Sequence, residues 1–286
     1  FFPSSDVTIK EHLSYIKKDE MPIFLVDNSN YVARTSIVKS SETINEQIKE
    51  IIETLTINSK KSTYIRDGFK PIIPENTKII DLKLDNEILT INFSKEFLTV
   101  NETNEELMLE ALIYSLTELK EIKKIKILVE NIPFTKLPNS NKKLPEYLDK
   151  TYGINKIYNL NSLKETSKTT IYYLSKINDY YYYVPVTKVS NEKLERVEII
   201  IKELKSTPIY HTNLISYLKA SANMTNYELL ENAISLSFNN YLIANMKEEQ
   251  ILEEVKYSIA LSLRDTYGIN EVIFNIPDSE NSKISI

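Results

Sequence analysis

The sequence contains no cysteine and no tryptophan, and it has only three glycines and two histidines in 286 residues. Without cysteine there is no disulfide framework, no thiolate nucleophile and no cysteine-ligated metal. The isolated glycines, Gly68, Gly153 and Gly268, cannot form a Walker loop or a G-x-G-x-x-G dinucleotide-binding motif. We therefore expect no cofactor.

The two histidines, His12 and His211, lie far apart in the chain. Neither has a second histidine at the spacing of metal ligands, so the sequence predicts no metal site. Serine-based catalysis would need one of these histidines as its base, and no nucleophile-elbow motif accompanies either of them. We therefore assign no catalytic residue.

Strong charge of one sign and long apolar runs are also missing. The net charge is −5, and the lysine pairs, such as Lys60-Lys61 and Lys142-Lys143, are short and scattered, which excludes a basic footprint for nucleic acid. No apolar run approaches the length of a membrane span. Since the chain begins Phe-Phe-Pro rather than with Met, we expect any membrane attachment to use a segment outside this chain.

An internal repeat is present instead. The stretch from Lys70 to Lys95 aligns without a gap with the stretch from Ile215 to Asn240. Apolar residues meet apolar residues at alternate positions: Leu82, Leu84, Leu89, Ile91 and Phe93 align with Tyr227, Leu229, Ile234, Leu236 and Phe238. Alternation of this kind predicts two half-buried strands in each copy. Asp85-Asn86, and more weakly Glu231-Asn232, indicate the tight turn between them.

Two further blocks align at nearly the same offset. Upstream, helix-spaced apolar residues match: Ile48, Ile51, Ile52 and Leu55 align with Val197, Ile200, Ile201 and Leu204. We expect Ser41 and Ser190 to cap these helices, and a β-hairpin to precede each of them. Downstream, Leu112, Leu116, Ile122, Ile125, Ile127 and Val129 align with Ile259, Leu263, Ile269, Val272, Phe274 and Ile276, which predicts a second helix and a fifth strand.

The repeat predicts an α+β fold of two tandem β-β-α-β-β-α-β modules, with helices packed on small sheets. We expect an N-terminal lead-in over residues 1–21, a first module over 22–158, a linker over 159–168 and a second module over 169–286. We expect the two modules to superpose, with Ile91 and Leu236 at equivalent positions and likewise Leu116 and Leu263.

The residues of the first module resemble the GerMN domain family. The resemblance lies in Ile73–Lys78, Leu89–Phe97 and Ser115–Glu118, and the closing Tyr152–Asn155 is similar to the family's terminal Ile-Asn. It implies tandem domains similar to ring-building motifs, in a sporulation or spore germination protein. It further implies an extracytoplasmic, membrane-anchored scaffold that supports a channel complex between mother cell and forespore, with protein partners and self-association. The unusually low glycine content departs from the family.

A spore-wall hydrolase, or an accessory factor of sporulation or germination, is the alternative function. Paired carboxylates, which glycoside hydrolysis requires, occur at Glu105-Glu106, Glu248-Glu249 and Glu253-Glu254. These pairs fall at helix starts or on turns beside the apolar stripe, where negative charge is favourable for electrostatic reasons alone. We therefore expect them to be solvated and the protein not to be an enzyme.

The run Tyr180–Tyr183 is the most unusual surface feature of the sequence. Alternation along a strand sends Tyr181 and Tyr183 to one face, and Tyr180 and Tyr182 to the other. A strand that is aromatic on both faces needs cover on both, from another layer of the chain or from a partner. Because tyrosine is favoured at interfaces, Tyr181 and Tyr183 are the candidate partner-binding residues.

Overall fold

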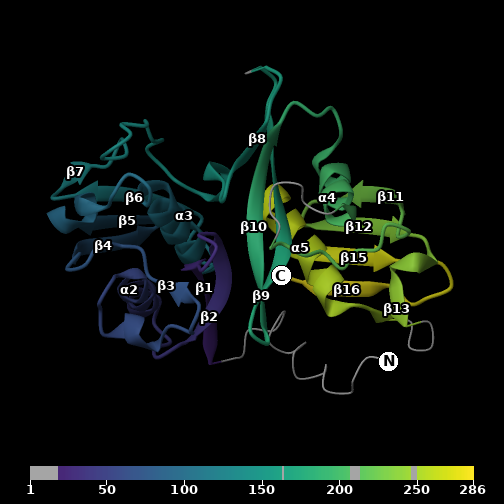
Figure 1. Cartoon of the computed structure of the whole chain (residues 1–286), viewed down its shortest axis with the longest axis horizontal. Coiled ribbons are helices and arrows are strands. Elements are labelled where there is room, and N and C mark those ends of the chain that lie inside the picture. Colours follow the sequence, from purple (N-terminus) through teal and green to yellow (C-terminus); the bar gives the residue numbers. More distant parts are fainter. Residues whose placement is uncertain (1–18, 163, 207–212, 246–249) are drawn as a thin grey trace. The chain divides into compact units, whose positions relative to one another are not determined.

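The computed structural model describes residues 19–162, 164–206, 213–245 and 250–286. These residues form two compact units that meet in sequence between Asn155 and Lys156 (Figure 1). Each unit contains one copy of the repeat, and the predicted strands and helices occur in the predicted order, with further short strands between and after them. Strands also extend into both ends of the linker that we expected over residues 159–168. Residues 156–158, which we assigned to the end of the first module, belong to the second unit.

The first unit consists of β1 (Glu20–Asp27), β2 (Val32–Val38), α2 (Ile44–Leu55), β3 (Phe69–Lys70), β4 (Ile79–Asp85), β5 (Ile88–Phe93), α3 (Glu105–Leu116), β6 (Lys124–Val129) and β7 (Ile132–Pro133). β1 pairs antiparallel with both β2 and β3. The second sheet has the order β4-β5-β6-β7. Its central strands β5 and β6 are parallel, because α3 provides the crossover that a parallel pair requires.

The second unit consists of β8 (Ile157–Asn159), β9 (Ser167–Ile177), β10 (Tyr180–Ser190), α4 (Arg196–Lys205), β11 (Met224–Leu229), β12 (Ala233–Phe238), β13 (Ile243–Asn245), β14 (Gln250–Ile251), α5 (Glu253–Tyr267), β15 (Glu271–Asn275) and β16 (Ser282–Ser285). β10 pairs antiparallel with β9 and parallel with β8. The other main sheet has the order β11-β12-β15-β16, again with a parallel central pair.

Strand register confirms the repeat in detail. In the first unit Ile91 lies opposite Leu82 on one side and opposite Ile127 on the other. In the second unit Leu236 lies opposite Tyr227 and Phe274, which are the residues that the alignment matches to Leu82 and Ile127. Blocks that were aligned separately in sequence therefore meet in the same register in both units.

The predicted helix faces form the cores. All eight matched residues of α2 and α4 are buried, and so are Leu116 of α3 and Leu263 of α5. The helix starts differ from the prediction: α2 begins after Thr43, and Ser190 is the last residue of β10. The N-cap of α4 is Glu195, five residues later, and it forms a capping box with Glu198, because β10 extends past the position where we expected the strand to end.

A buried serine hydroxyl occupies the same place in both units. Ser115 Oγ on α3 accepts a 2.9 Å hydrogen bond from the backbone N–H of Phe24 on β1. Ser262 Oγ on α5 accepts a 2.8 Å hydrogen bond from the backbone N–H of Tyr172 on β9. Each hydroxyl satisfies a backbone donor that would otherwise be buried without a partner. The second helix of each module is thereby fixed to the module's first strand.

Candidate functional site

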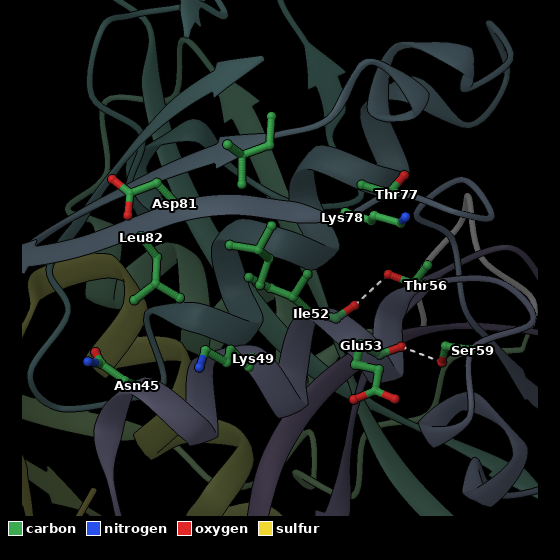
Figure 2. Close-up of a pocket in the computed structure, with 12 residues that line it drawn as sticks. Asn45, Lys49, Ile52, Glu53, Thr56, Ser59, Thr77, Lys78, Asp81 and Leu82 are labelled. Carbon is green, nitrogen blue, oxygen red and sulfur yellow. Dashed lines mark hydrogen bonds between the residues drawn. The ribbon is translucent and has the colours of Figure 1, made fainter. Parts of the chain in front are cut away.

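A groove of about 690 Å³ lies on the first unit between α2 and the edge strand β4 (Figure 2). Ile52, which is 3% exposed, lies at its base on α2, and Leu82 faces it from β4. The lining residues are Asn45, Lys49, Ile52, Glu53, Thr56, Ser59, Thr77, Lys78, Ile79, Ile80, Asp81 and Leu82. The groove is thus apolar inside and charged along its sides.

The hydroxyl groups in the groove already bind backbone carbonyls of the same unit, Thr77 that of Pro74 and the other two those of α2. Thr56 Oγ1 donates a 2.7 Å hydrogen bond to the carbonyl of Ile52, and Ser59 Oγ donates a 2.6 Å hydrogen bond to the carbonyl of Glu53 (Figure 2). They bind carbonyls of the last turn of α2, where the backbone N–H of Thr56 also donates to the Glu53 carbonyl at 3.0 Å. What the groove offers a ligand is therefore apolar surface, the edge of a strand and polar groups of both charges: two carboxylates (Glu53 and Asp81), two ammonium groups (Lys49 and Lys78) and the Asn45 amide.

The prediction that Glu105 is solvated is wrong. Glu105 is 1% exposed, and its carboxylate accepts hydrogen bonds from the backbone N–H of Asn139 at 2.8 Å and of Ser140 at 2.9 Å, and from the Asn139 side-chain amide at 3.0 Å. Burial opposes ionisation, but these hydrogen bonds outweigh it and hold the pKa of Glu105 below its ordinary value. Glu105 anchors a loop and has no free oxygen with which to activate water.

The other carboxylates of the predicted pairs do not anchor a loop as Glu105 does. Glu106 has a side chain that is 35% exposed, and its carboxylate lies 2.5 Å from Lys142 Nζ, in a surface ion pair. Glu253 lies 3.5 Å from Lys256 Nζ on the same helix. Glu254 is not fully solvated as expected, because it is partly buried and its Oε2 is buried with no hydrogen-bond partner among the described residues. Glu248-Glu249 and both histidines, His12 and His211, lie outside the described residues.

Two buried ion clusters were missed by sequence reasoning. In the first unit Glu50, 5% exposed, accepts hydrogen bonds from Ser40 Oγ at 2.6 Å and from Lys61 Nζ at 2.8 Å. In the second unit Lys188, 6% exposed, donates to Glu203 at 2.6 Å and also to Glu192. Burial opposes the charge of Lys188, yet the two carboxylates raise its pKa. These charges stabilise one another inside each module, and only contacts distant in sequence reveal them.

The tyrosine-rich strand follows the predicted alternation, but only one of the two predicted interface residues is accessible to a partner. Tyr183 is 1% exposed and packs in a cluster with Tyr172, Leu174 and Leu261 of its own unit. Its assignment to a partner interface is therefore corrected: it belongs to the core. Tyr181 packs at the border of this cluster and keeps part of its surface exposed, so its interface role stays a prediction.

Neither a metal-binding cluster nor a membrane-spanning helix occurs in the part of the chain that the structure describes. Within those ranges no three His, Asp or Glu side chains gather closely enough to hold a metal ion. Nor does any helix in the same ranges have the length and apolar character needed to span a bilayer.

The fold defines a class: a tandem repeat of α+β modules, each with helices packed on small mixed sheets. Residues 15–135 match the family model described as "Germane: Sporulation and spore germination". The spore germination protein GerM of Bacillus subtilis (strain 168) is 26% identical over 257 residues, which cover 87% of this chain and 69% of that protein.

The fold is similar to that of a solved structure titled "Tandem GerMN domains of the sporulation protein GerM from Bacillus subtilis". The TM-score is 0.81 at 22% identity, and the match covers 91% of this chain and 92% of that one. This chain is similar to sporulation and spore germination proteins of the GerM type, and its fold is that of tandem GerMN domains. These comparisons indicate no catalytic family.

Proposed function

We propose that this chain is a non-catalytic assembly protein of sporulation, which supports the ring or channel complex between mother cell and forespore. In this proposal it works outside the cytoplasm and is held at a membrane through a segment outside this chain. The sporulation setting is supported by the names of its relatives. The mode of action is supported by the resemblance of its modules to ring-building motifs, which act through surfaces.

The proposal rests on one observation: carboxylates inside each module bind groups of that same module. Glu105 and Glu50, which are buried, and Glu203, whose side chain is 18% exposed, all accept hydrogen bonds or ion pairs from groups inside their own module. A general acid or base needs a proton-accepting oxygen within reach of substrate, and these oxygens are engaged in holding loops and helices. Both modules instead expose the edge of a sheet, which is suited to binding another chain.

Wall hydrolysis is the second candidate, because two carboxylates, Glu53 and Asp81, line the same groove from α2 and β4. Glycoside hydrolysis uses such a pair, one as the acid and one as the base or nucleophile. We favour binding, since both side chains are exposed to solvent, whereas such a pair of carboxyls needs two different environments, one of them apolar.

One experiment separates the two. The purified chain is tested for binding to extracytoplasmic domains of channel proteins from a sporulating bacterium, and in parallel for digestion of cell-wall material. We expect binding without digestion, weaker binding for Tyr181→Glu and unchanged binding for the control Tyr181→Phe, all with native circular dichroism. Digestion that is abolished by Asp81→Asn or Glu53→Gln, with binding unaffected, would replace the assembly role with the enzyme.

A further inference from the structure

Each module exposes one edge strand of the same kind. β4 in the first unit and β11 in the second unit are the terminal strands of their four-stranded sheets, and each pairs with one neighbour within the described residues. An edge strand presents backbone N–H and C=O groups that can pair with another chain. The two edges are equivalent positions of the repeat, so their chemistry can be compared residue by residue.

The hairpin turns fix which backbone groups point outward. Asp85 and Ile88 flank the two-residue turn of the first hairpin, and Leu230 donates a 2.9 Å hydrogen bond to Ala233 across the turn of the second. Hydrogen-bonded and non-hydrogen-bonded pairs alternate along antiparallel strands. Counting back from each turn, the outward-facing backbone groups are therefore those of Leu82 and Leu84 on β4, and of Tyr227 and Leu229 on β11.

The side chains of these outward-facing residues all lie on the core side of their sheets. Leu82 lies opposite the buried Ile91, and Tyr227 lies opposite the buried Leu236. Leu229 is nevertheless 50% exposed, which is unusual for an apolar residue on that face. The charged side chains, Lys83 on β4 and Glu228 on β11, point to the other side, since alternate residues of a strand face opposite ways.

We propose that β4 of one copy pairs antiparallel with β11 of a second copy, so that Leu82 lies opposite Leu229 and Leu84 opposite Tyr227. This contact deepens the assembly role proposed above and rests on it. The outward-facing backbone groups of the two strands then meet directly, and the side chain of Leu229 enters the groove beside Leu82 (Figure 2).

Antiparallel pairing follows from the direction of the side chains. In a parallel pair an outward-facing residue lies beside a residue whose backbone groups face the other way. Leu82 would then lie beside Glu228 or Asn226 rather than Leu229, and the apolar faces of the two sheets would point to opposite sides. The antiparallel arrangement keeps the core faces on one side and covers the exposed Leu229.

Charge selects the register. In the proposed pairing Lys83 lies opposite Glu228, on the solvent side of the joined sheet. A shift of two residues in one direction places Glu228 opposite Asp85, and a shift in the other direction places it opposite Asp81. Like charges directly opposite each other are destabilising, whereas opposite charges contribute favourably. Lys83 Nζ lies 3.9 Å from Asp85 Oδ2 in a loose ion pair on its own strand, and 74% of the Lys83 side chain is accessible, so its ammonium group can also reach a carboxylate on the facing strand.

The contact joins different surfaces on the two copies. A heterologous contact of this type leaves β11 of the first copy and β4 of the second free to bind again. The same pairing can therefore extend to more copies, and it closes into a ring if the rotation between neighbours permits.

The first test uses cysteine cross-linking in the full chain, which has no native cysteine. In the proposed register positions 83 and 228 form a non-hydrogen-bonded pair, whose Cα atoms lie about 4.5 Å apart, within reach of a disulfide. We expect Lys83→Cys mixed with Glu228→Cys to give a disulfide-linked dimer under mild oxidation. Each variant alone, and the shifted control Asp81→Cys mixed with Glu228→Cys, should cross-link far less.

The second test exchanges the charges and follows self-association by sedimentation velocity. Lys83→Glu and Glu228→Lys should each weaken association about tenfold, because an attractive pair becomes repulsive. An equimolar mixture of the two variants should associate as the unmodified chain does, since every contact between unlike copies regains an opposite pair.

Monomer at all concentrations, or cross-linking of Lys83→Cys with itself as efficiently as with Glu228→Cys, would overturn the pairing. Since both tests use only the purified chain, such a result would leave binding to other channel proteins, and hence the proposed function, to be judged by its own assay.

Discussion

Glu105 provides the sharpest test of how the first module is held together. Its carboxylate accepts hydrogen bonds from three donors, two on Asn139 and one on Ser140, and the side chain is 1% exposed. A hydrogen bond to a charged group contributes about 1.5–3 kcal/mol, and part of this loss is recovered when water reaches the released loop. We therefore expect Glu105→Ala to lower the free energy of unfolding by about 2–4 kcal/mol.

The assay is urea denaturation followed by circular dichroism at pH 7, with Glu46→Ala as the control. Glu46 lies in the first turn of α2 with a half-exposed side chain paired to Lys49, and its loss should cost well under 1 kcal/mol, as should that of Glu106. A cost for Glu105→Ala no larger than for Glu46→Ala would refute the role of Glu105 as an anchor.

The lowered pKa of Glu105 makes the stability of the fold depend on pH, and the direction of that dependence follows from the shift. The folded pKa is lowered by hydrogen bonds from Asn139 and Ser140 against the opposing effect of burial, so the stabilisation is fully present above the unfolded pKa. It is lost as the pH falls through the folded value. The difference in stability between the unmodified chain and Glu105→Gln should therefore shrink below about pH 4. A difference that grows on acidification would contradict the lowered pKa.

The remaining predictions concern packing, the buried serines and the tyrosine strand. Ile91→Ala and Leu116→Ala should each cost about 2–5 kcal/mol in urea denaturation, since both side chains are fully buried; losses below 1 kcal/mol would show the core faces to be wrong. Ser115→Ala and Ser262→Ala should each cost about 1–3 kcal/mol, because each leaves a backbone N–H buried without its acceptor; unequal behaviour of the two would argue against equivalent roles. Tyr183→Glu should unfold the second module while Tyr181→Glu leaves it folded, as near-ultraviolet circular dichroism can report.

The spacing of apolar residues predicted the architecture, because the buried face of a strand or an amphipathic helix places apolar residues at a fixed spacing in the sequence. The alternation from Leu82 to Phe93 identified β4 and β5, and the repeated helix spacing identified α2 and α4. The repeat made these assignments mutually supporting, since an error in one copy would have broken the match with the other. The alignment implies that the register is the same in both units, and Ile91 does pair with Ile127 as Leu236 does with Phe274.

Contacts between distant segments could not be predicted in this way. Glu105 has the local pattern of a solvated helix start, and it is buried because the loop at Asn139 and Ser140 folds over it. The helix cap expected at Ser190 failed because β10 continues to that residue. The groove between α2 and β4 depends on how a helix lies beside an edge strand, which no local signal reports.

The most direct test of a role exerted through surfaces rather than chemistry is spore yield in a sporulating host whose own copy has been replaced. Lys83→Glu and Glu228→Lys should each lower the yield while the purified variants keep native circular dichroism, and the two substitutions together should restore it. Full yield in both single variants, with loss of yield from Asp81→Asn alone, would contradict an assembly role and point to catalysis in the groove.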